Sequence, residues 1–160
     1  MASKFFLAIC LVGILASLTP VCLAQNSNKD FLDAHNEARA AVGVGPMTWD
    51  DKLAAYALNY AKKRINDCAM EHSMGPYSEN IAGGINSTTA VQGVNLWVDE
   101  KKFYDYKSNS CVGGECRHYT QVVWRDTVRV GCARVYCKTG GIFIICDYEP
   151  PGNNEGEHPY

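Results

Sequence analysis

The sequence predicts an α+β fold, in which helices and strands follow one another in mixed order and pack in layers. Apolar residues recur at helical spacing through the first two thirds of the chain and gather in two strand-like runs near its end. Neither an internal repeat nor a regular alternation of strand and helix is present. The chain of 160 residues is long enough for one domain with a substantial core.

The N-terminal segment has the pattern of a secretory signal peptide. Lys4 is its only charge, a long apolar run follows, and Ala24 supplies the small residue that signal peptidase favours. We therefore predict residues 1–24 as a signal peptide and residues 25–160 as a single secreted domain. After the leader, no stretch reaches the roughly 18 consecutive apolar residues that cross a bilayer, so we expect no membrane span.

The charge balance of the chain is mildly acidic. Its net charge is −2, and removal of Lys4 with the leader makes it slightly more negative. This balance gives no electrostatic reason to expect nucleic acid or an anionic membrane as a partner. We expect a monomer that requires no cofactor.

Two helices are predicted in the first half of the mature chain. The first covers residues 30–42, where apolar residues recur at helical spacing until Gly43 ends the pattern. The second runs from Asp50 to Arg64, and its apolar positions follow the i, i+3, i+4, i+7 pattern of a helix with one buried face. Asp50 has a side chain that can cap the N-terminus of this helix.

A polar stretch rich in glycine separates these helices from a third, which begins near Thr88 or Thr89 and carries Glu100. Residues 104–115 are predicted as a loop because Ser, Asn and Gly dominate them. Two strands are predicted after this loop, at residues 128–136 and 142–148, with a hairpin turn at Thr139-Gly140-Gly141.

Six of the eight cysteines remain after the leader, and an even number in a secreted chain favours disulfides over zinc. They are Cys68, Cys111, Cys116, Cys132, Cys137 and Cys146. Folding the chain about the hairpin turn places Cys132 roughly opposite Cys146, and Cys111 is close enough to Cys116 to close a small ring. Cys68 would then pair with Cys137, although these arguments leave other connectivities open.

Four segments of the chain resemble, in the same order, the motifs of the CAP superfamily. RHYTQVVWRDT at 117–127 matches the family signature position for position, and FIICDYEPPGNN at 143–154 matches a second motif. HNEAR at 35–39 and SENI at 78–81 match the other two. The superfamily joins cysteine-rich secretory proteins, insect venom antigens and plant pathogenesis-related class 1 proteins, and the chain is most similar to the plant branch.

This resemblance implies a fold, a disulfide pattern and a biological role. The implied fold is a three-layer α-β-α sandwich around a small, mostly antiparallel sheet. The implied disulfides are Cys68–Cys137, Cys111–Cys116 and Cys132–Cys146. The implied role is that of a plant defence protein, antimicrobial or antifungal, secreted to the apoplast. Two positions depart from the family pattern, since Ser78 replaces a more usual Gly and Asp147 a more usual Asn.

The resemblance also implies a metal-binding cleft, matched residue by residue to His72, Glu79, Glu100 and His118. Imidazole nitrogens and carboxylate oxygens are ordinary ligands for zinc and similar divalent ions. The same cleft suggests an alternative function, a metal-dependent, protease-like hydrolase in which one Glu acts as general base on a metal-bound water. The chain has no H-E-x-x-H motif, and we favour a binding protein over an enzyme.

Several members of the family bind sterols or fatty acids through apolar surfaces away from this cleft. Here Phe103, Tyr104 and Tyr106 precede the small disulfide ring, and we predict them as lipid contacts. Capture of a sterol would inhibit a microbe that depends on it. The competing interpretation is that these three aromatic residues only pack in the core.

The tail, defined here as residues 150–160, resembles a short defence peptide that plant members release after the position of Glu149, and a released peptide would act on a receptor. We predict the tail to be extended and exposed. Its alternative role is to pack on the sheet.

Asn86-Ser87-Thr88 forms an N-glycosylation sequon, so Asn86 is a predicted glycan site.

Overall fold

The computed structural model describes residues 26–160, so the predicted signal peptide lies outside the described residues. At the centre is a four-stranded sheet with the strand order β1-β5-β6-β2. β1 runs parallel to β5, and the other neighbours are antiparallel. The strands are β1 Thr48–Trp49, β2 Ser78–Gly84, β5 Arg129–Tyr136 and β6 Ile142–Glu149.

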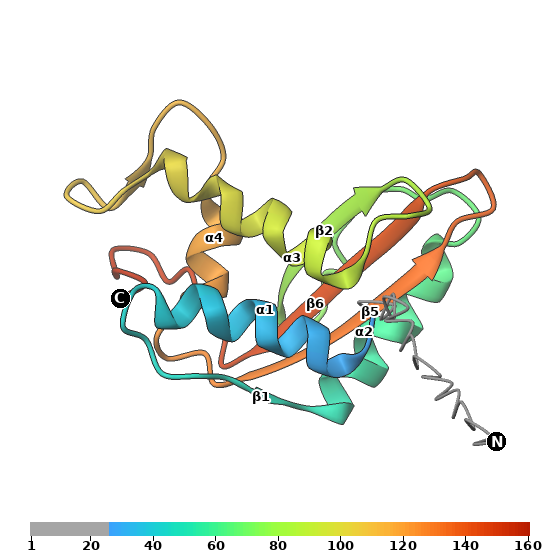
Figure 1. The fold of residues 1–160 in the computed structure, drawn as a ribbon, viewed down its shortest axis with the longest axis horizontal. Helices are drawn as coiled ribbons and strands as arrows, with labels where there is room; N and C mark the ends of the chain where they lie inside the picture. Colours follow the sequence, from blue (N-terminus) through green and yellow to red (C-terminus); the bar gives the residue numbers. More distant parts are fainter. Residues whose placement is uncertain (1–25) are drawn as a thin grey trace, which may run out of the picture.

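Helices cover both faces of this sheet (Figure 1). α1, α3 and α4 pack on one face and α2 packs on the other, and each side has its own buried apolar cluster. The three-layer α-β-α sandwich is therefore confirmed. These elements are α1 Asn28–Ala40, α2 Asp51–Arg64, α3 Ala90–Val98, the 3-10 helix η1 Asp99–Phe103, α4 Arg117–Val122, and a small hairpin of β3 Tyr104–Asp105 and β4 Ser110–Cys111.

The second predicted helix agrees with α2 to within a residue at its start. The side chain of Asp50 accepts hydrogen bonds from the backbone N–H groups of Lys52 and Leu53, at 2.8 and 3.1 Å, as a helix cap does. α2 packs tightly on β5 because Gly131 has no side chain, and a Cβ atom there would lie 2.1 Å from the backbone nitrogen of Ala54. The helix is thus fixed at its first turn by both a cap and a close contact.

The sequence does not predict β2 or α4. β2 contains Glu, Asn, Ala and two Gly, which are poor strand formers, yet it pairs with β6 along its whole length. α4 has only six residues, too few to show a helical pattern. The third helix also differs from expectation, because its α-helical part ends at Val98 and Glu100 lies on η1. Tertiary pairing, which local sequence does not reveal, therefore positions Glu79 on β2 and His118 on α4.

The disulfides Cys68–Cys137, Cys111–Cys116 and Cys132–Cys146 are all present and confirm the implied pattern. Cys132 and Cys146 are also register partners in the β5–β6 pair, as the hairpin turn predicted. The first disulfide joins the segment after α2 to the end of β5, and the second joins β4 to the start of α4. Two of the disulfides thus tie peripheral segments to the sandwich, and the third joins the two central strands β5 and β6.

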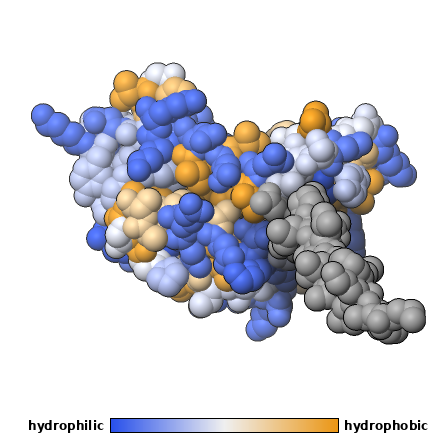
Figure 2. Space-filling view, viewed as in Figure 1, coloured by the Kyte–Doolittle hydropathy of each residue, from blue (hydrophilic) through white to orange (hydrophobic). Residues whose placement is uncertain are grey.

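The surface of the described residues is mixed in character. On the face shown in Figure 2, apolar groups form small patches separated by hydrophilic residues. No helix within residues 26–160 is both long enough and apolar enough to cross a membrane.

Candidate functional site

The start of β2 and the segment before it form the first half of the predicted cleft. The side chain of Glu79 is only 4% exposed, and its Oε2 accepts a hydrogen bond from His72 Nδ1 at 3.2 Å. The same carboxylate accepts from the backbone N–H of Ser73 at 2.8 Å and from the Ser73 hydroxyl. Because a carboxylate can only accept, the neutral His72 ring carries its proton on Nδ1 and leaves Nε2 free.

α4, held in place by Glu100 on η1, forms the second half of the cleft. Glu100 Oε1 accepts a hydrogen bond from His118 Nδ1 at 2.7 Å. Glu100 Oε2 accepts from the backbone N–H groups of His118 and Tyr119, at 3.1 and 3.4 Å. These N–H groups belong to the first turn of α4, where a helix leaves its donors without partners. Glu100 therefore accepts hydrogen bonds from the N–H groups at the start of α4, and it also orients the His118 ring so that Nε2 is left free.

β2 connects the two halves of the cleft, because the side chains of consecutive strand residues point to opposite faces of the sheet and so reach different partners. Glu79 faces His72, whereas Asn80 donates from Nδ2 to the carbonyl oxygen of His118 at 3.0 Å and to the Tyr148 hydroxyl at 3.1 Å. Asn80 is 2% exposed, so these bonds hold α4 against the sheet without competition from water. Asn80 is a positioning residue that the sequence does not single out. The SENI motif contained it, but its partners become visible only in the fold.

Together the two halves enclose a cleft of about 500 Å³. Its lining residues are His72, Glu79, Asn80, Glu115, Arg117, His118 and Asn153. Three of the four predicted metal ligands line the cleft, while Glu100 supports His118 and is not part of the lining. Within residues 26–160, no three His, Cys, Asp or Glu side chains are arranged so that they could hold a metal ion.

Each of the two histidines, taken singly, has the chemistry of a ligand for a divalent cation. A metal-binding His typically donates its second ring nitrogen to a carboxylate, which is the arrangement that His72 and His118 both have. Glu79 and Glu100 use their oxygen atoms to hold these rings and nearby backbone N–H groups. The cleft therefore offers two imidazole nitrogens, whereas catalytic zinc takes three protein ligands and structural zinc takes four. Zinc at this cleft stays a prediction.

Asp147 adds a carboxyl group that sequence analysis did not place in the site. It lies on β6 directly opposite Glu79 on β2 and is fully buried. Within residues 26–160, no donor faces either of its side-chain oxygen atoms. Burial, and after it the negative charge of Glu79, raises the pKa of Asp147 to about 8. The sequence shows that Asp147 replaces a more usual Asn, but it does not show that the Asp147 carboxyl group is buried beside that of Glu79.

The three predicted lipid contacts lie at and beside the β3–β4 hairpin. Phe103 is half-buried, and the Lys102 ammonium lies 5.0 Å from the centre of its ring. Tyr104 is half-buried, and burial, followed by the neighbouring Tyr160, raises its pKa to about 12. Tyr106 is 49% exposed and stacks on Tyr160 with 5.3 Å between ring centres. Two of the three side chains therefore contact the tail.

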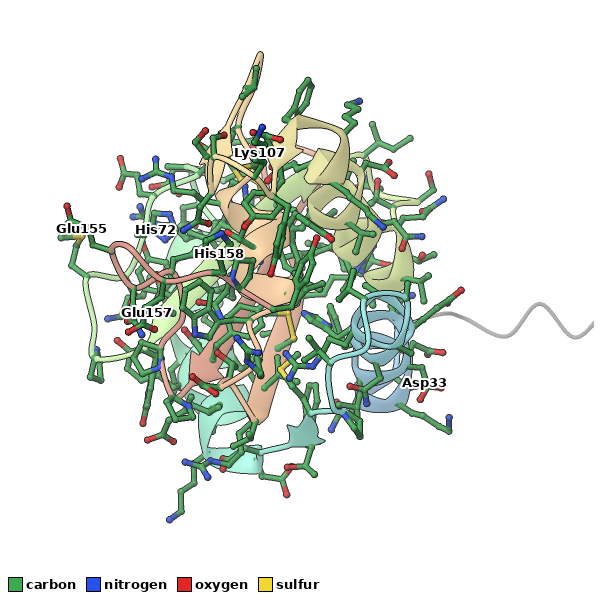
Figure 3. The ribbon with its side chains drawn as sticks, turned by 90° about the vertical axis from the view of Figure 1, so that its left-hand side faces the viewer. Asp33, His72, Lys107, Glu155, Glu157 and His158 are labelled. Atoms are coloured by element: carbon green, nitrogen blue, oxygen red, sulfur yellow. A yellow bond between two sulfur atoms is a disulfide. The ribbon has the colours of Figure 1, made fainter. Side chains whose placement is uncertain are left out.

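The tail has no helix or strand, but it is not exposed throughout. Pro159 is buried, and its carbonyl oxygen accepts a hydrogen bond from the backbone N–H of Arg125 at 2.7 Å. Figure 3 shows Glu157 and His158 on the same side of the molecule as His72 and away from Asp33 on α1. This differs from the expected exposed tail, because the last residues dock on the protein.

Asn86 lies in an exposed turn between β2 and α3. Its Oδ1 accepts a hydrogen bond from the backbone N–H of Gly141 at 2.9 Å. Nδ2, the atom to which a glycan would be joined, takes no part in that bond. Glycosylation of Asn86 stays a prediction.

Solved structures share this architecture. SmVAL4, a venom allergen-like protein from Schistosoma mansoni, superimposes with a TM-score of 0.66 at 26% identity, covering 82% of this chain and 92% of that one. NaASP2, whose structure was solved with Zn²⁺, gives a TM-score of 0.68 at 26% identity, covering 81% of this chain and 82% of that one. These likenesses agree with the three-layer arrangement described above.

Sequence comparisons identify the family. The basic form of pathogenesis-related protein 1 of Nicotiana tabacum is 62% identical over 137 residues, which is 86% of this chain and 77% of the relative. Pathogenesis-related protein 1 of Arabidopsis thaliana is 51% identical over 152 residues, which is 95% of this chain and 94% of the relative. The model of the cysteine-rich secretory protein family matches residues 32–148. The chain therefore belongs to the CAP family, and its curated relatives include plant pathogenesis-related proteins of class 1.

Proposed function

We propose that this chain is a secreted plant defence protein that binds a sterol, or a similarly flat lipid, at its aromatic hairpin. The relationship to pathogenesis-related protein 1 supports the defence role. The three disulfides support an oxidising extracellular compartment, because such bonds persist where thiols are not kept reduced. Lipid binding is the part of the proposal that needs a structural argument.

The observation that carries lipid binding is a ladder of three tyrosine rings from the core to the surface. Tyr119 is 1% exposed, Tyr104 is half-buried, and Tyr106 is 49% exposed. The ring centres of Tyr119 and Tyr104 are 6.1 Å apart, and those of Tyr104 and Tyr106 are 6.3 Å apart. Tyr119 packs in the core, and the rings of Tyr104 and Tyr106 supply the aromatic surface that a flat ligand could contact. We call Tyr104, Tyr106 and Tyr119 the tyrosine ladder.

Polar groups beside the ladder suit the single hydroxyl of a sterol. The Tyr104 hydroxyl donates to Asn109 Oδ1 at 2.8 Å, and both residues line a small hollow that also contains Thr120 and Trp124. Pockets for small molecules are typically lined by apolar and aromatic side chains, with a few polar groups that fix the orientation of the ligand. Tyr104 and Trp124 supply the aromatic part of this lining, and most of the other lining residues are polar.

The geometry of the cleft supports a binding protein over the alternative hydrolase. A hydrolase of that kind needs a carboxylate free to take a proton from a metal-bound water. Glu79 already accepts from His72 and Ser73, and Glu100 accepts from His118 and two backbone N–H groups. In this arrangement both carboxylates orient histidines, so neither has the position of a general base.

A sterol titration tests the proposal. Dehydroergosterol, whose fluorescence reports binding, is added to the wild type, Tyr106→Ala and Tyr136→Ala. Tyr136 is a matched control because it is also an exposed tyrosine, 61% exposed, at the far end of β5 from the hairpin (Figure 1). Tyr106→Ala is expected to weaken binding about tenfold, the effect of losing one or two aromatic contacts, and Tyr136→Ala to leave it unchanged. Equal binding by all three proteins would contradict a lipid site at the hairpin.

A second candidate function is zinc binding, favoured by the two free Nε2 atoms of His72 and His118. The Zn²⁺ in the structure of NaASP2 adds support from a related fold. We expect calorimetry to detect Zn²⁺ binding that is lost in His72→Ala and in His118→Ala. His158→Ala serves as the control, because His158 is exposed and lies outside the cleft lining. Zn²⁺ binding that survives both cleft substitutions would contradict this assignment.

The release of the tail as a signalling peptide is a further part of the proposal. The bond after Glu149 is flanked by two hydrogen bonds, one from the Val128 N–H to Glu149 O at 3.2 Å and one from Thr127 Oγ1 to Pro150 O at 2.8 Å. Cleavage there would require the end of β6 to open locally. Mass spectrometry of extracellular fluid from plant tissue tests the release: a fragment beginning at Pro150 supports it, and only intact tails in stimulated tissue contradict it.

A further inference from the structure

The tail ends against the tyrosine ladder. Tyr160 stacks on Tyr106, and the two ring planes are 27° apart. Its ring also meets Tyr104 edge-on with 6.2 Å between centres, and its hydroxyl lies 3.3 Å from that of Tyr119. His158 contributes a second ring, whose centre lies 4.9 Å from that of Tyr106. The side chains expected to receive a lipid are therefore in contact with the protein's own tail.

Hydrogen bonds to the backbone hold the tail in this position. The Tyr106 hydroxyl donates to the carbonyl oxygen of Tyr160 at 2.9 Å, and Asn109 Nδ2 donates to that of Glu157 at 2.8 Å. The Arg125 N–H donates to Pro159 O at 2.7 Å. These donors come from the hairpin and from the turn after α4, so the tail bridges two elements. The tail therefore binds the tyrosine ladder through both ring contacts and specific hydrogen bonds.

The space left beside the docked tail is too small for a sterol. The hollow between the hairpin, α4 and the tail has a volume of about 180 Å³, below the roughly 300 Å³ at which small-molecule sites begin. Six of its lining residues belong to the tail itself: Asn153, Asn154, Glu155, Gly156, Glu157 and Pro159. Moving the tail would therefore remove one wall of the hollow and uncover the faces of Tyr104 and Tyr106 together.

We infer that the tail is an intramolecular competitor for the tyrosine ladder, so that a flat apolar ligand binds only when residues 157–160 leave it. This inference rests on the lipid site of the proposed function. It adds a regulatory element, because the apparent affinity for lipid is lowered by the fraction of molecules in which the tail is docked. An event that loosens the tail and leaves the tyrosine ladder intact raises the apparent affinity for lipid.

The inference is tested in the full chain with two substitutions of the same residue. Tyr160→Ala removes the ring that stacks on Tyr106, whereas Tyr160→Phe keeps the ring and loses only the hydroxyl near Tyr119. Dehydroergosterol affinity is measured for both variants and the wild type. Hydrogen exchange of the Arg125 amide is followed in parallel, because that amide donates to Pro159 and so reports tail docking without any lipid.

Tyr160→Ala is expected to bind dehydroergosterol about tenfold more tightly than the wild type, which corresponds to losing one stacked pair. The Arg125 amide of Tyr160→Ala should exchange faster than that of the wild type. Tyr160→Phe should behave as the wild type in both measurements. In the wild type, saturating lipid should speed exchange of the Arg125 amide. If Tyr160→Ala releases the tail but binds dehydroergosterol no more tightly than the wild type, the competition is overturned. It is also overturned if the Arg125 amide stays protected in the wild type saturated with lipid, or in Tyr160→Ala.

The outcomes also separate this inference from the function on which it rests. If the wild type and Tyr160→Ala bind lipid equally and Tyr106→Ala weakens that binding, the lipid site stands and the competition fails. If neither the wild type nor Tyr160→Ala binds lipid, both fail together.

Discussion

Glu79 on β2 and Asp147 on β6 face each other across an antiparallel pair, so that a second, fully buried carboxyl group lies beside the Glu79 that lines the cleft. Glu79 is satisfied by His72 and Ser73, whereas no donor within the described residues faces Asp147. When Asp147 carries a proton it can donate to Glu79, and when it loses that proton two negative charges share a buried site. This pair makes the chain differ from a relative with Asn at the same position.

Asp147→Asn is expected to stabilise the protein. The amide keeps the shape of the side chain and removes the cost of protonating or burying a carboxyl group, so the free energy of unfolding at pH 7 should rise by about 2 kcal/mol or more. Urea denaturation measures the change. Asp33→Asn is the matched control, because Asp33 is exposed on α1 and pairs with Lys29 (Figure 3). A variant no more stable than the control would contradict the buried-pair interpretation.

The same residue predicts how stability depends on pH. The pKa of Asp147 is about 8 in the folded protein, against an ordinary value of 3.8. Between these values the folded state binds a proton that the unfolded state has lost, so this residue's contribution to stability falls as the pH rises. The stability of the wild type relative to Asp147→Asn should therefore decline from about pH 4 to about pH 8, by at most about 1.4 kcal/mol per pH unit.

Denaturation curves of both proteins, measured at intervals across this range, test the prediction. Taking the difference between them cancels the other titrating groups. The difference should be small near pH 4 and constant above the pKa of Asp147. A difference that does not change with pH would show that Asp147 has an ordinary pKa.

The parts of the fold that the sequence predicts are those fixed by neighbouring residues. Asp50 and the apolar stripe after it define α2, and the turn at Gly140 sets the register that brings Cys132 to Cys146. The family resemblance pointed to four residues, three of which line the cleft, yet it did not show that the four form two separate His–Glu pairs. That division depends on β2 and α4, whose local sequences have little preference for their structures.

Asp147 and Tyr160 show a second limit of sequence analysis. An Asp in place of Asn is visible in the sequence, but its pKa depends on burial beside Glu79, and β2 itself was not predicted. Tyr160 stood in a polar segment rich in Pro and Gly, which is typical of an exposed tail. Its contacts come from a hairpin more than fifty positions earlier in the chain, where Tyr106 donates across a separation of 54 residues. Such long-range contacts have no local pattern.

Tyr148→Phe tests the buried network behind the cleft. The Tyr148 hydroxyl donates to His35 Nε2 at 2.9 Å, since His35 Nδ1 is used for the carbonyl oxygen of Phe31 at 2.7 Å. Burial lowers the pKa of His35 to about 4, so the ring is neutral at pH 7 and needs a donor at Nε2. Removing the hydroxyl leaves a buried acceptor unpaired and should lower the free energy of unfolding by about 1–3 kcal/mol.

Thermal and urea denaturation measure this loss, with Tyr136→Phe as the control at an exposed tyrosine. Asn80 keeps its bond to the His118 carbonyl in Tyr148→Phe, so the cleft should keep its shape. Unchanged stability would mean that water replaces the lost hydroxyl.

The three disulfides are expected to differ in their contributions to stability, in the order of the chain lengths that they close. Cys68–Cys137 spans 69 residues, Cys132–Cys146 spans 14 and Cys111–Cys116 spans 5. A cross-link reduces the conformational entropy of the unfolded chain more when it closes a longer loop, which gives about 4, 3 and 2 kcal/mol respectively. Replacing each pair with alanine in turn, followed by urea denaturation, measures the three values. If loss of Cys111–Cys116 destabilised the protein as much as loss of Cys68–Cys137, the small ring would act on the folded state instead, by holding the hairpin against α4.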